Sequence, residues 1–473
     1  MIIGGGVVGL CAATLLARDG HRVTVLERDP APPVTGSEAW EQWERRGVNQ
    51  FRLLHFLLAR FRTAADAELP GLIPALLDDG ALQFNALEHL APAVTGGRRD
   101  EDSRFTSVTG RRPVVEAAVA RFAEATPGVM IRRGVAVRGL LVDDGTDGVR
   151  HVTGVATDDG EELAADLVID AAGRRSALPD LLVAAGAERP AEERDDCGFI
   201  YYSRHFRSTD GLPAVLGPLL QPYDSVSILT LPCDSGTWGV GLITSAGDGP
   251  LRALSRKEVW ETALEAYPLA AHWGHGEPIT DVQLMAKIED RRRTFVVDGR
   301  PVATGVLAVG DSWACTNPSV GRGITIGLLH AIALRDLLRE MPTTAARDLA
   351  VRWDELTAER VDPFVEDTLA FDRHRLAEME AQIAGTAYET DDPSWAFGGA
   401  LAASAGRDPD QLRHFLDIVN LNARGVDVLA RPGVLERTIE LGAPAPLPGP
   451  RRADLVELVS AAASPSALSS PSR

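Results

Sequence analysis

Three glycines near the start of the chain have the spacing of a phosphate-binding turn. Gly4, Gly6 and Gly9 form a GxGxxG pattern directly after Ile2-Ile3 and before an apolar helical stretch. In such a turn the first glycine permits a tight bend, the second lets the backbone approach a diphosphate, and the third lets helix and strand pack closely. The unpaired N–H groups of the helix N-terminus would then face the phosphates. The pattern predicts a dinucleotide-binding site.

An acidic residue completes this pattern. The stretch VTVLE is typical of a strand and ends at Glu27, about 20 residues after the glycines, where a carboxylate can accept hydrogen bonds from ribose hydroxyls. The first seventeen residues carry no charged side chain, but the first basic residue, Arg18, follows this apolar stretch, so a secretory signal is not predicted. Because strands usually have about 5–6 residues and only Met1 to Ile3 precede the turn, we expect the true start a few codons upstream.

A second set of residues, within 306–334, indicates a flavin. VLAV has the character of a buried strand, Gly310-Asp311 ends it, and Pro318, Gly321 and Gly323 precede a helix. An acid at the end of that strand can bind a ribityl chain, and the N–H groups of the helix start can stabilise negative charge on a reduced flavin ring. An ordinary strand-to-helix turn with an aspartate cap is the alternative. Together with the first pattern, these residues favour FAD.

Four segments carry a resemblance to a known family. They are GVVGLCAATLLARDGHRVTVLERDP, RRPVVEAAV, LVIDAAGRRSALP and GDSWACTNPSVGRG, in that order. In them the sequence resembles the single-component FAD-dependent aromatic hydroxylases, the superfamily of para-hydroxybenzoate hydroxylase, over roughly residues 1–335. The resemblance implies a glutathione-reductase-type, Rossmann-like FAD-binding domain of α/β class, an inserted antiparallel β-sheet lobe for the substrate, and a helical C-terminal region.

The same resemblance implies which residues hold FAD. The adenosine diphosphate half would lie on the glycine turn and Glu27, and the flavin half near the second set. For the arginines involved, a solvated helix face is the alternative. The implied contacts are Gly4, Gly6, Gly9 and Glu27 for adenosine diphosphate, Arg45 or Arg46 for the pyrophosphate, Arg112 for the ribityl and phosphate region, Asp311 for the ribityl chain, and Pro318, Gly321 and Gly323 for the isoalloxazine.

One departure from the family concerns the electron donor. Where the family has an Asp-Gly pair linked to use of NAD(P)H, this sequence has Ala172 before Gly173, and Asp170 could only partly substitute. The sequence contains no second strand-GxGxxG-helix pattern for a nicotinamide cofactor. NAD(P)H is therefore expected only as a transient reductant, or a separate flavin reductase would supply the electrons.

Residues for catalysis and substrate contact come from two parts of the chain. We select His55, Tyr201 and Arg204 as catalytic candidates because a phenolic substrate benefits from a base that removes its proton. A packed core histidine is the alternative for His55, and only one of two consecutive tyrosines on a strand can face a pocket. Cys315 is expected to be a packed thiol. Further candidates for the pocket and its walls are Gln50, His205, Trp238 and Trp313.

Composition excludes several classes of partner. A net charge of −19 argues against nucleic acid, which needs clustered Lys and Arg. The four cysteines are scattered without a CxxC pair, so neither a metal site nor a disulfide framework is predicted, and a cytoplasmic location is the expectation. No apolar run reaches the roughly 20 residues needed to span a membrane. The expected partner is an apolar small molecule.

The patterning along the chain divides it into regions. Residues 50–80, which include FRLLHFLLARF, suggest helices, whereas segments such as SVSILTLP and TWGVGLITS suggest an antiparallel sheet. The predicted regions are 1–185 and 296–345 for the FAD-binding domain, 186–295 for the β-sheet substrate lobe, 346–461 for the helical C-terminal region, and 462–473 for a disordered tail.

These observations lead to one function and two rivals. We expect an FAD-dependent monooxygenase of secondary metabolism that hydroxylates or epoxidises an apolar, aromatic or polycyclic molecule through a flavin hydroperoxide. A reductase or dehydrogenase of the same fold is one rival. An FAD-bound scaffold that cyclises its substrate without net redox change is the other, and Ala172 favours it mildly. A serine hydrolase is not supported because GxSxG is absent, and a flavin halogenase is not supported because WxWxIP is absent.

Overall fold

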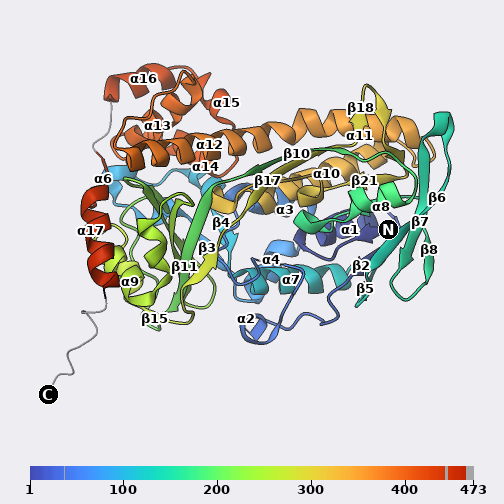
Figure 1. The fold of residues 1–473 in the computed structure, drawn as a ribbon, viewed down its shortest axis with the longest axis horizontal. Helices are drawn as coiled ribbons and strands as arrows, with labels where there is room; N and C mark the ends of the chain where they lie inside the picture. Colours follow the sequence, from blue (N-terminus) through green and yellow to red (C-terminus); the bar gives the residue numbers. More distant parts are fainter. Residues whose placement is uncertain (37, 49, 443–445, 465–473) are drawn as a thin grey trace.

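The computed structural model describes residues 1–36, 38–48, 50–442 and 446–464. The molecule is elongated, with the parallel sheet and its helices in one half, and an antiparallel sheet with the C-terminal helices in the other (Figure 1). Two consecutive helices, α11 (Ala346–Arg360) and α12 (Asp362–Ala384), run along one side of both halves. The architecture is mixed α/β, as expected, while the boundaries of the individual regions stay predictions.

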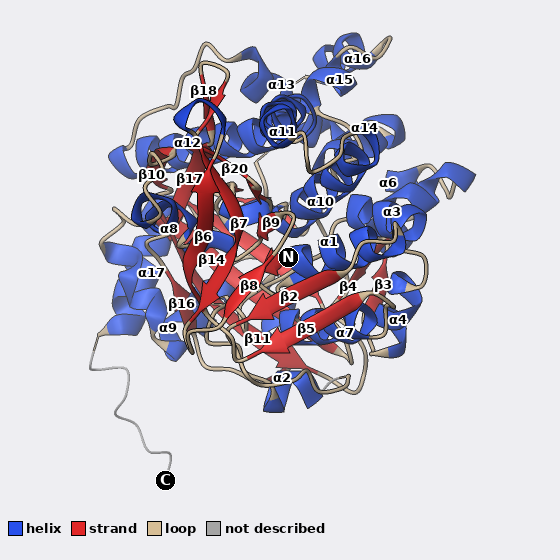
Figure 2. Cartoon of the chain, turned by 90° about the vertical axis from the view of Figure 1, so that its right-hand side faces the viewer, coloured by secondary structure: helices blue, strands red, loops and turns tan. Residues whose placement is uncertain are grey.

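A five-stranded parallel sheet positions the N-terminal glycine turn. Strand β1 pairs with β2 on one side and β9 on the other, so the turn that follows β1 lies at the middle of the sheet. Helix α1 (Val7–Arg18) packs against α10 (Gly323–Glu340) and α7 (Arg112–Glu124) (Figure 2). In spatial order the strands are β21 (Val306–Ala308), β9 (Val168–Asp170), β1 (Ile2–Ile3), β2 (Val23–Glu27) and β5 (Val129–Arg133).

The polar residues selected from the sequence follow the ends of these strands. Glu27 ends β2, Asp170 ends β9, Gly4 follows β1, and Asp311 lies just beyond β21. The strands are parallel, so their carboxyl ends meet at one edge of the sheet. This edge is where open α/β sheets bind ligands.

Smaller sheets flank and connect the two halves. The antiparallel pair β10–β17 extends between the halves (Figure 1). The strands of these sheets are β6 (Val137–Asp144), β7 (Arg150–Thr157), β8 (Glu162–Ala164) and β20 (Ala303–Thr304) in one sheet, β10 (Ala191–Asp196), β17 (Glu289–Thr294) and β22 (Ala314–Cys315) in another, and the pairs β3 (Leu82–Phe84) with β4 (Ser107–Thr109) and β18 (Val296–Val297) with β19 (Arg300–Pro301).

An antiparallel sheet forms the core of the second half. Its strand β11 pairs along its whole length with β14, so that Tyr201 lies opposite Ile243 and Tyr202 opposite Leu242. Successive side chains point to opposite faces, which gives the sheet two different buried faces. In order the strands are β12 (Leu220–Pro222), β13 (Val226–Pro232), β14 (Thr237–Ser245), β11 (Phe199–Arg207) and β15 (Glu277–Pro278), with β16 (Gln283–Met285) also beside β11.

Two of the C-terminal helices, α13 and α14, begin at sequence signals that cap helices. Asp392 and Asp408 each precede a proline, and each side chain accepts a hydrogen bond from a backbone N–H of the helix that follows. Helix α17 packs against α9 (Lys257–Glu265). The helices are α13 (Pro393–Ala405), α14 (Pro409–Val419), α15 (Gly425–Leu429), α16 (Val434–Leu441) and α17 (Arg452–Ala463). Residues 462 and 463 of the expected tail therefore belong to a helix, and 465–473 lie outside the described residues.

The N-terminal region contains fewer helical residues than the sequence suggested. The remaining helices are α2 (Glu38–Gln42), α3 (Ala59–Glu68), α4 (Leu72–Asp78), α5 (Ala86–His89), α6 (Pro92–Thr95) and α8 (Leu178–Ala184). Residues 51–58 are not helical, which corrects the expectation for FRLLHFLL. A continuous apolar run without helical period does not distinguish a helix from an extended segment.

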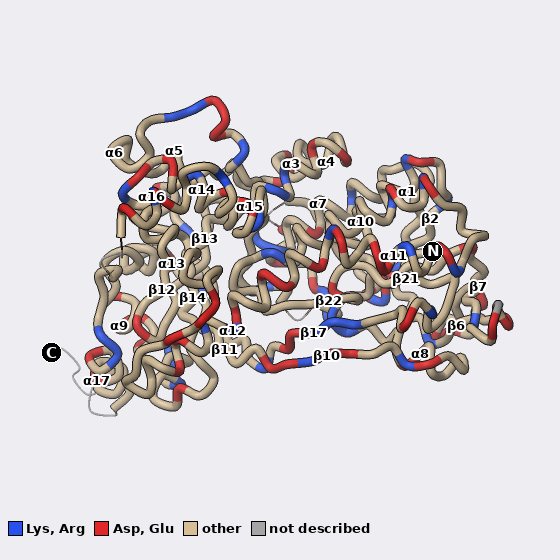
Figure 3. The backbone as a smooth tube through the Cα atoms, turned by 90° about the horizontal axis from the view of Figure 1, so that it is seen from above, with Lys and Arg blue, Asp and Glu red and all other residues tan. Residues whose placement is uncertain are grey.

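Charged residues are mixed along the chain. Figure 3 shows acidic and basic segments lying close to one another in both halves. Many are paired, for example Arg339 with Asp19 and Arg207 with Glu277. Every helix within the described residues is too short or too polar to cross a membrane.

Candidate functional site

The glycine turn has the geometry that its pattern predicts. Gly4 has φ +105°, and a Cβ there would lie 2.5 Å from the carbonyl oxygen of Ala171. A Cβ on Gly9 would lie 2.2 Å from the carbonyl oxygen of Gly4. By contrast, nothing lies within 4 Å of a Cβ placed on Gly6, which is the N-cap of α1. Gly4 and Gly9 are therefore required by the fold, and Gly6 leaves space next to the helix start.

The N-terminus of α1 is open to a ligand. No side chain caps it, and no acidic residue lies in its first turn. Gly6, Val7 and Val8 all line a cavity. The first N–H groups of a helix have no partner within the helix, and the helix dipole favours an anion there. The space at Gly6 and these free donors fit a diphosphate, so the fold accommodates the cofactor that the sequence predicts.

Glu27 and Arg45 belong to a chain of buried ion pairs. Glu27 accepts hydrogen bonds from the backbone N–H groups of Gly5 (2.8 Å) and Asp29 (2.9 Å), and it pairs with Arg45. Arg45 also donates to Glu116 at 2.5 Å. The Glu27 carboxylate is therefore already occupied by protein donors, and the guanidinium of Arg45 is held between two carboxylates.

Arg112 is the predicted phosphate arginine that reaches the cavity wall. Its Nε donates to Glu116 at 2.6 Å, and its side chain lines the cavity. Burial alone would raise the pKa of Glu116, but Arg112 and Arg45 together lower it below its ordinary value. Arg46 is exposed and lies away from the cavity wall. Of the three arginines expected near the phosphates, only Arg112 therefore faces the cavity.

The residues within 306–334 that the sequence assigns to a flavin lie on the wall of the same cavity. Asp311 lies on the cavity wall, and its Oδ1 is 3.9 Å from a Cβ placed on Gly323. Pro318 to Gly323 continue this wall, and Gly321 has φ +66°, which favours glycine. Burial raises the pKa of Asp311, although Arg174 and Arg112 counteract this effect. Among the described residues, no group hydrogen-bonds to the Asp311 carboxylate, so it is available to a ligand.

The cavity is large and has two parts. Its volume is about 1380 Å³, which exceeds the roughly 300–1,000 Å³ of an ordinary small-molecule site. One part lies against the glycine turn, Arg112 and Asp311. The other is enclosed by the antiparallel sheet and by helices α12, α13 and α14. A cavity of this volume has room for a dinucleotide cofactor and a second molecule.

The apolar part of the cavity is built by sheet alternation and by helices far along the chain. On β13, alternate residues line the cavity. These are Ser227, Leu229 and Leu231, whereas Ile228 does not line it. Phe397 on α13 and Phe415 on α14 form part of the opposite wall. The sequence predicted a helical C-terminal region but did not predict that it encloses the cavity. No short motif marks these residues, because they are ordinary apolar positions of helices.

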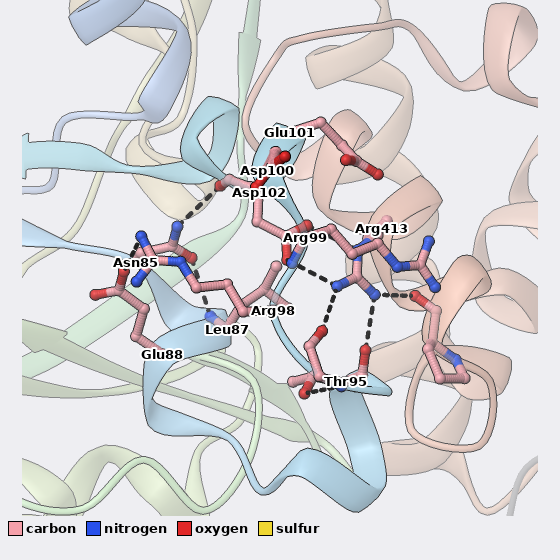
Figure 4. A network of polar contacts seen from close by, with 12 residues as sticks. Asn85, Leu87, Glu88, Thr95, Arg98, Arg99, Asp100, Glu101, Asp102 and Arg413 are labelled. Atoms are coloured by element: carbon pink, nitrogen blue, oxygen red, sulfur yellow. Dashed lines mark hydrogen bonds and ion pairs between the residues drawn. The ribbon is translucent and has the colours of Figure 1, made fainter.

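A buried ion pair fixes α14 to the N-terminal half. Arg413 donates to both carboxylate oxygens of Asp102 at 2.7 Å and to the carbonyl oxygens of Thr95 and Gly97 (Figure 4). Both ionic side chains are buried. Because α14 contributes part of the cavity wall, this pair positions that wall relative to the rest of the protein.

The catalytic candidates divide between the cavity and the core. Gln50 and His55 line the cavity. Nε2 of His55 is buried without a partner among the described residues, and burial, together with the charge of Arg112, lowers the pKa of His55 to about 3. Tyr201 lies just behind the wall, where its hydroxyl donates to Oδ1 of Asn317 at 2.6 Å. Burial raises the pKa of Tyr201 well above its ordinary value.

Arg204 lies on the other face of the antiparallel sheet, which corrects the expectation that it lines the pocket. It follows Tyr201 by three positions on β11, so strand alternation places it on the opposite face. There it donates to Glu261 at 2.7 Å and its guanidinium lies over the rings of Phe206 and Trp260. Its role is packing between the sheet and α9.

Three other pocket candidates also lie away from the cavity wall. Trp238 donates to the carbonyl oxygen of Trp273 at 2.7 Å, Trp313 packs its ring against His330, and His205 packs against Trp40. Cys315 is buried, and burial raises the pKa of its thiol to about 11. A thiol that remains protonated is inert, as expected for a packed cysteine.

The departure at Ala172 has a defined local structure. Asp170 is buried, and its carboxylate accepts from the backbone N–H of Ala172 at 3.0 Å and from the hydroxyl of Ser176. Gly173 and Arg174 line the cavity, but Asp170 does not. Asp170 therefore holds the turn in place, and both of its carboxylate oxygens accept hydrogen bonds from the protein itself.

Asp372 is a polar residue of the cavity wall that the sequence did not indicate. Asp372 on α12 lines the cavity and accepts hydrogen bonds from the Asn317 side chain (3.1 Å) and the Ser319 hydroxyl (2.8 Å). Burial raises its pKa to about 7. No motif surrounds it, since it lies in the middle of a charged helix. Within the described residues, no group of His, Cys, Asp and Glu has the arrangement of a metal site.

Comparisons with known proteins agree with this geometry. A family model described as FAD dependent oxidoreductase matches residues 1–53. Protein Rv3254 of Mycobacterium tuberculosis is 30% identical over 398 residues, which cover 77% of this chain and 77% of that protein. Squalene monooxygenase of Mus musculus is 23% identical over 360 residues, or 72% of this chain and 55% of the mouse protein.

A solved structure has the same fold. PqsL, a probable FAD-dependent monooxygenase from Pseudomonas aeruginosa, superposes with a TM-score of 0.59 at 18% sequence identity, covering 81% of this chain and 97% of PqsL. The likeness extends through both halves of the molecule, so the cofactor turn and the antiparallel sheet belong to one shared fold.

Proposed function

Since this chain belongs to the FAD-dependent oxidoreductases, in one family with Rv3254, we propose that it is a monooxygenase of an apolar small molecule. The substrate class would be aromatic or polycyclic, and the reaction a hydroxylation or epoxidation in secondary metabolism. The observation that supports this proposal is the single cavity that joins the glycine turn and Asp311 to an apolar space. A flavin reductase requires only that an electron donor can reach the flavin. A monooxygenase also requires a space beside the flavin that holds the substrate and excludes water.

The residues of the chain would divide the work as follows. The glycine turn and Arg112 would bind the diphosphate, Asp311 the ribityl chain, and Pro318 to Gly323 would lie beside the ring. When bound, FAD supplies two-electron redox chemistry and, once reduced, reactivity toward oxygen. Leu229, Leu231 and the facing helices would exclude water and hold the substrate. Regions 1–185 and 296–345 would thus bind the cofactor, and 186–295 and 346–461 would enclose the substrate.

The electron donor is the second part of the proposal. Because Ala172 stands where the family has an acid and Asp170 holds the turn instead, we expect slow reduction by free NAD(P)H. Either NAD(P)H binds transiently at the surface, or a separate flavin reductase supplies electrons. Stopped-flow reduction by NADPH, with and without an added flavin reductase, distinguishes these routes.

The proposed oxidation is tested with ¹⁸O₂. The protein is loaded with FAD, reduced anaerobically with dithionite, and mixed with ¹⁸O₂ and a panel of naphthols and larger polycyclic phenols. We expect ¹⁸O in at least one product by mass spectrometry. Stoichiometric hydrogen peroxide, with no labelled product from any member of the panel, would contradict the proposal and favour a reductase or dehydrogenase.

A non-redox cyclase scaffold is the second candidate, and the absence of the acid at position 172 favours it. Such a scaffold needs bound FAD for its structure but neither oxygen nor reductant. Full conversion of a substrate under anaerobic conditions, with the flavin remaining oxidised, would identify it.

A further inference from the structure

Asp372 has an unusual position for a carboxylate. It lies on α12, is only 2% exposed, and lines the cavity beside Asn317 and Ser319, the residues that flank Pro318. Both hydrogen bonds that it accepts reach the same oxygen, Oδ1. Its other oxygen, Oδ2, is buried and has no hydrogen-bond partner among the described residues. A buried polar atom without a partner is costly, so this oxygen calls for an explanation.

Two arginines of the same wall, Arg424 and Arg375, already have protein partners. Arg424 forms two hydrogen bonds of 2.8 Å with Asp367, and Arg375 donates to Glu378 and to backbone carbonyl oxygens. Four buried side-chain atoms of the described cavity wall have no hydrogen-bond partner. Three of them are nitrogens, one each in His55, Arg174 and Arg322. The fourth is Oδ2 of Asp372, which is the only oxygen among them.

A hydrogen-bonded chain behind Asp372 holds its carboxyl in place. The hydroxyl of Tyr201 donates to Oδ1 of Asn317, and the amide of Asn317 donates to Oδ1 of Asp372. The hydroxyl of Ser319 donates to the same oxygen. These donors fix the orientation of the carboxyl group and leave Oδ2 as its only free hydrogen-bonding atom.

We propose that Oδ2 of Asp372 binds a hydroxyl group of the substrate and so selects an apolar molecule that carries a hydroxyl at one end. This inference rests on the proposed function, because it requires the substrate to occupy the apolar part of the cavity. Asp372 is then a specificity-determining residue that sequence patterns do not reveal.

The acid–base properties of Asp372 explain why the selected group is a hydroxyl. The pKa of about 7 reflects burial first, with Asp290 raising it further and Ser319, Asn317 and Arg322 opposing the increase. Oδ1 accepts two hydrogen bonds, so the proton of the neutral form is carried by Oδ2. Oδ2 therefore donates in the neutral form and accepts in the ionised form. A hydroxyl satisfies both forms, whereas a carbonyl can only accept and an ammonium can only donate.

Two aromatic probes that differ by one hydroxyl test this inference. We would measure the dissociation constants of 2-naphthol and naphthalene for the FAD-loaded protein by equilibrium dialysis. The quantity of interest is the ratio of the two constants, because comparing this ratio between variants cancels the difference in hydrophobicity of the probes. In wild-type protein, 2-naphthol should bind more tightly than naphthalene.

Three variants complete the test. Asp372→Ala should reduce the preference for 2-naphthol about tenfold while the affinity for naphthalene stays within about twofold. Asp372→Asn keeps a donor and an acceptor, so it should retain part of the preference but make it independent of pH between 5 and 9, whereas the preference of wild type should change near pH 7. Glu380→Gln, on the exposed side of the same helix, should behave like wild type.

The binding measurements test the role of Asp372 independently of the proposed monooxygenase activity. An unchanged ratio in Asp372→Ala, or wild-type protein that binds both probes equally or neither, would overturn the role of Asp372. These results concern binding only. Failure of the ¹⁸O₂ experiment with intact selectivity for 2-naphthol would instead overturn the monooxygenase proposal and leave Asp372 as a binding residue.

Discussion

Arg413 donates two parallel hydrogen bonds, each 2.7 Å long, to the carboxylate of Asp102, which precedes it by 311 positions in the sequence. The remaining guanidinium donors reach the carbonyl oxygens of Thr95, Gly97 and Pro409. A guanidinium matches this arrangement because its planar donors can serve a carboxylate and several carbonyls at once. The pair ties a helix of the cavity wall to the N-terminal half of the protein.

Replacing Arg413 should therefore loosen the C-terminal helices. Arg413→Lys keeps the charge but loses the paired geometry, and Arg413→Ala leaves Asp102 buried without its partner. We expect Arg413→Ala to lower the free energy of unfolding by about 3–5 kcal/mol, with Arg413→Lys between it and wild type. Chemical denaturation gives these values.

An exposed pair on the same elements provides the control. Arg99 pairs with Asp410 at 2.6 Å, and the side chain of Arg99 is 36% exposed and that of Asp410 68% exposed. Arg99→Ala should cost at most about 1 kcal/mol, because an exposed ion pair contributes little. A similar loss from Arg99→Ala and Arg413→Ala would show that burial of the Arg413–Asp102 pair has no special effect.

Two of the arginines predicted near the phosphates, Arg112 and Arg46, should differ in their effect on FAD. Arg112→Ala should weaken FAD binding about 10- to 100-fold, since hydrogen bonds to a charged group contribute about 1.5–3 kcal/mol. Riboflavin, which has no phosphate, should bind Arg112→Ala and wild type equally. Arg46→Ala is the matched control, because Arg46 is exposed and away from the cavity. Fluorescence titration of the apoprotein measures these affinities, and equal losses for FAD and riboflavin would argue against a phosphate contact.

The residues that sequence patterns identified are those whose role depends on neighbours close in the chain. Gly4, Gly6 and Gly9 could be predicted because one turn requires all three, and Asp311 because it directly follows a buried strand. Asp372 could not be predicted in this way. Its partner Asn317 lies 55 positions away, and only the packing of α12 brings the two side chains together.

The errors have equally local causes. Arg204 was expected in the pocket because it lies on the same strand as Tyr201, but alternation along β11 places it on the face that packs against α9. The stretch around His55 was expected to be helical because it is apolar, yet its residues line the cavity in an extended loop. Arg45 was expected at the pyrophosphate, and the structure instead places it between Glu27 and Glu116.

Asp311 should affect FAD binding in a graded way. Asn at this position keeps the size and one acceptor oxygen but cannot carry a negative charge, and Ala keeps neither. We expect FAD affinity to decrease from wild type to Asp311→Asn to Asp311→Ala, with a cost of about 1.5–3 kcal/mol for Ala. With excess FAD, the melting temperature should follow the same order, because ligand binding stabilises the native state.

Asp298→Asn provides a control, since Asp298 is an exposed acid in the preceding β18–β19 hairpin. It should change neither quantity. If Asp311→Ala bound FAD as tightly as wild type while the apoprotein lost stability, Asp311 would be a structural residue of the turn and would not contact the ribityl chain.

The raised pKa of Asp372 predicts how the stability of the apoprotein depends on pH. The carboxyl has a pKa of about 7 in the folded state and about 3.9 in the unfolded state, so between these values the folded state binds more protons. The contribution of Asp372 should therefore become increasingly unfavourable as pH rises from about 4 to about 7, and constant above that range. Asp372→Asn cannot ionise and should lack this dependence.

The measurement is the difference in the free energy of unfolding between Asp372→Asn and wild type, determined by denaturation from pH 4 to pH 8. Buried histidines act in the opposite direction, because burial lowers the pKa of His330 to about 3 and that of His205 to about 4, and their neutral forms favour folding as pH rises. Taking the difference between the two proteins removes these contributions.

We expect Asp372→Asn to gain stability relative to wild type as pH rises toward 7, by at most about 1.4 kcal/mol for each pH unit that separates the folded-state pKa from the unfolded-state pKa. A difference that does not change with pH would mean that Asp372 is ionised throughout, and that Oδ2 acts only as a hydrogen-bond acceptor.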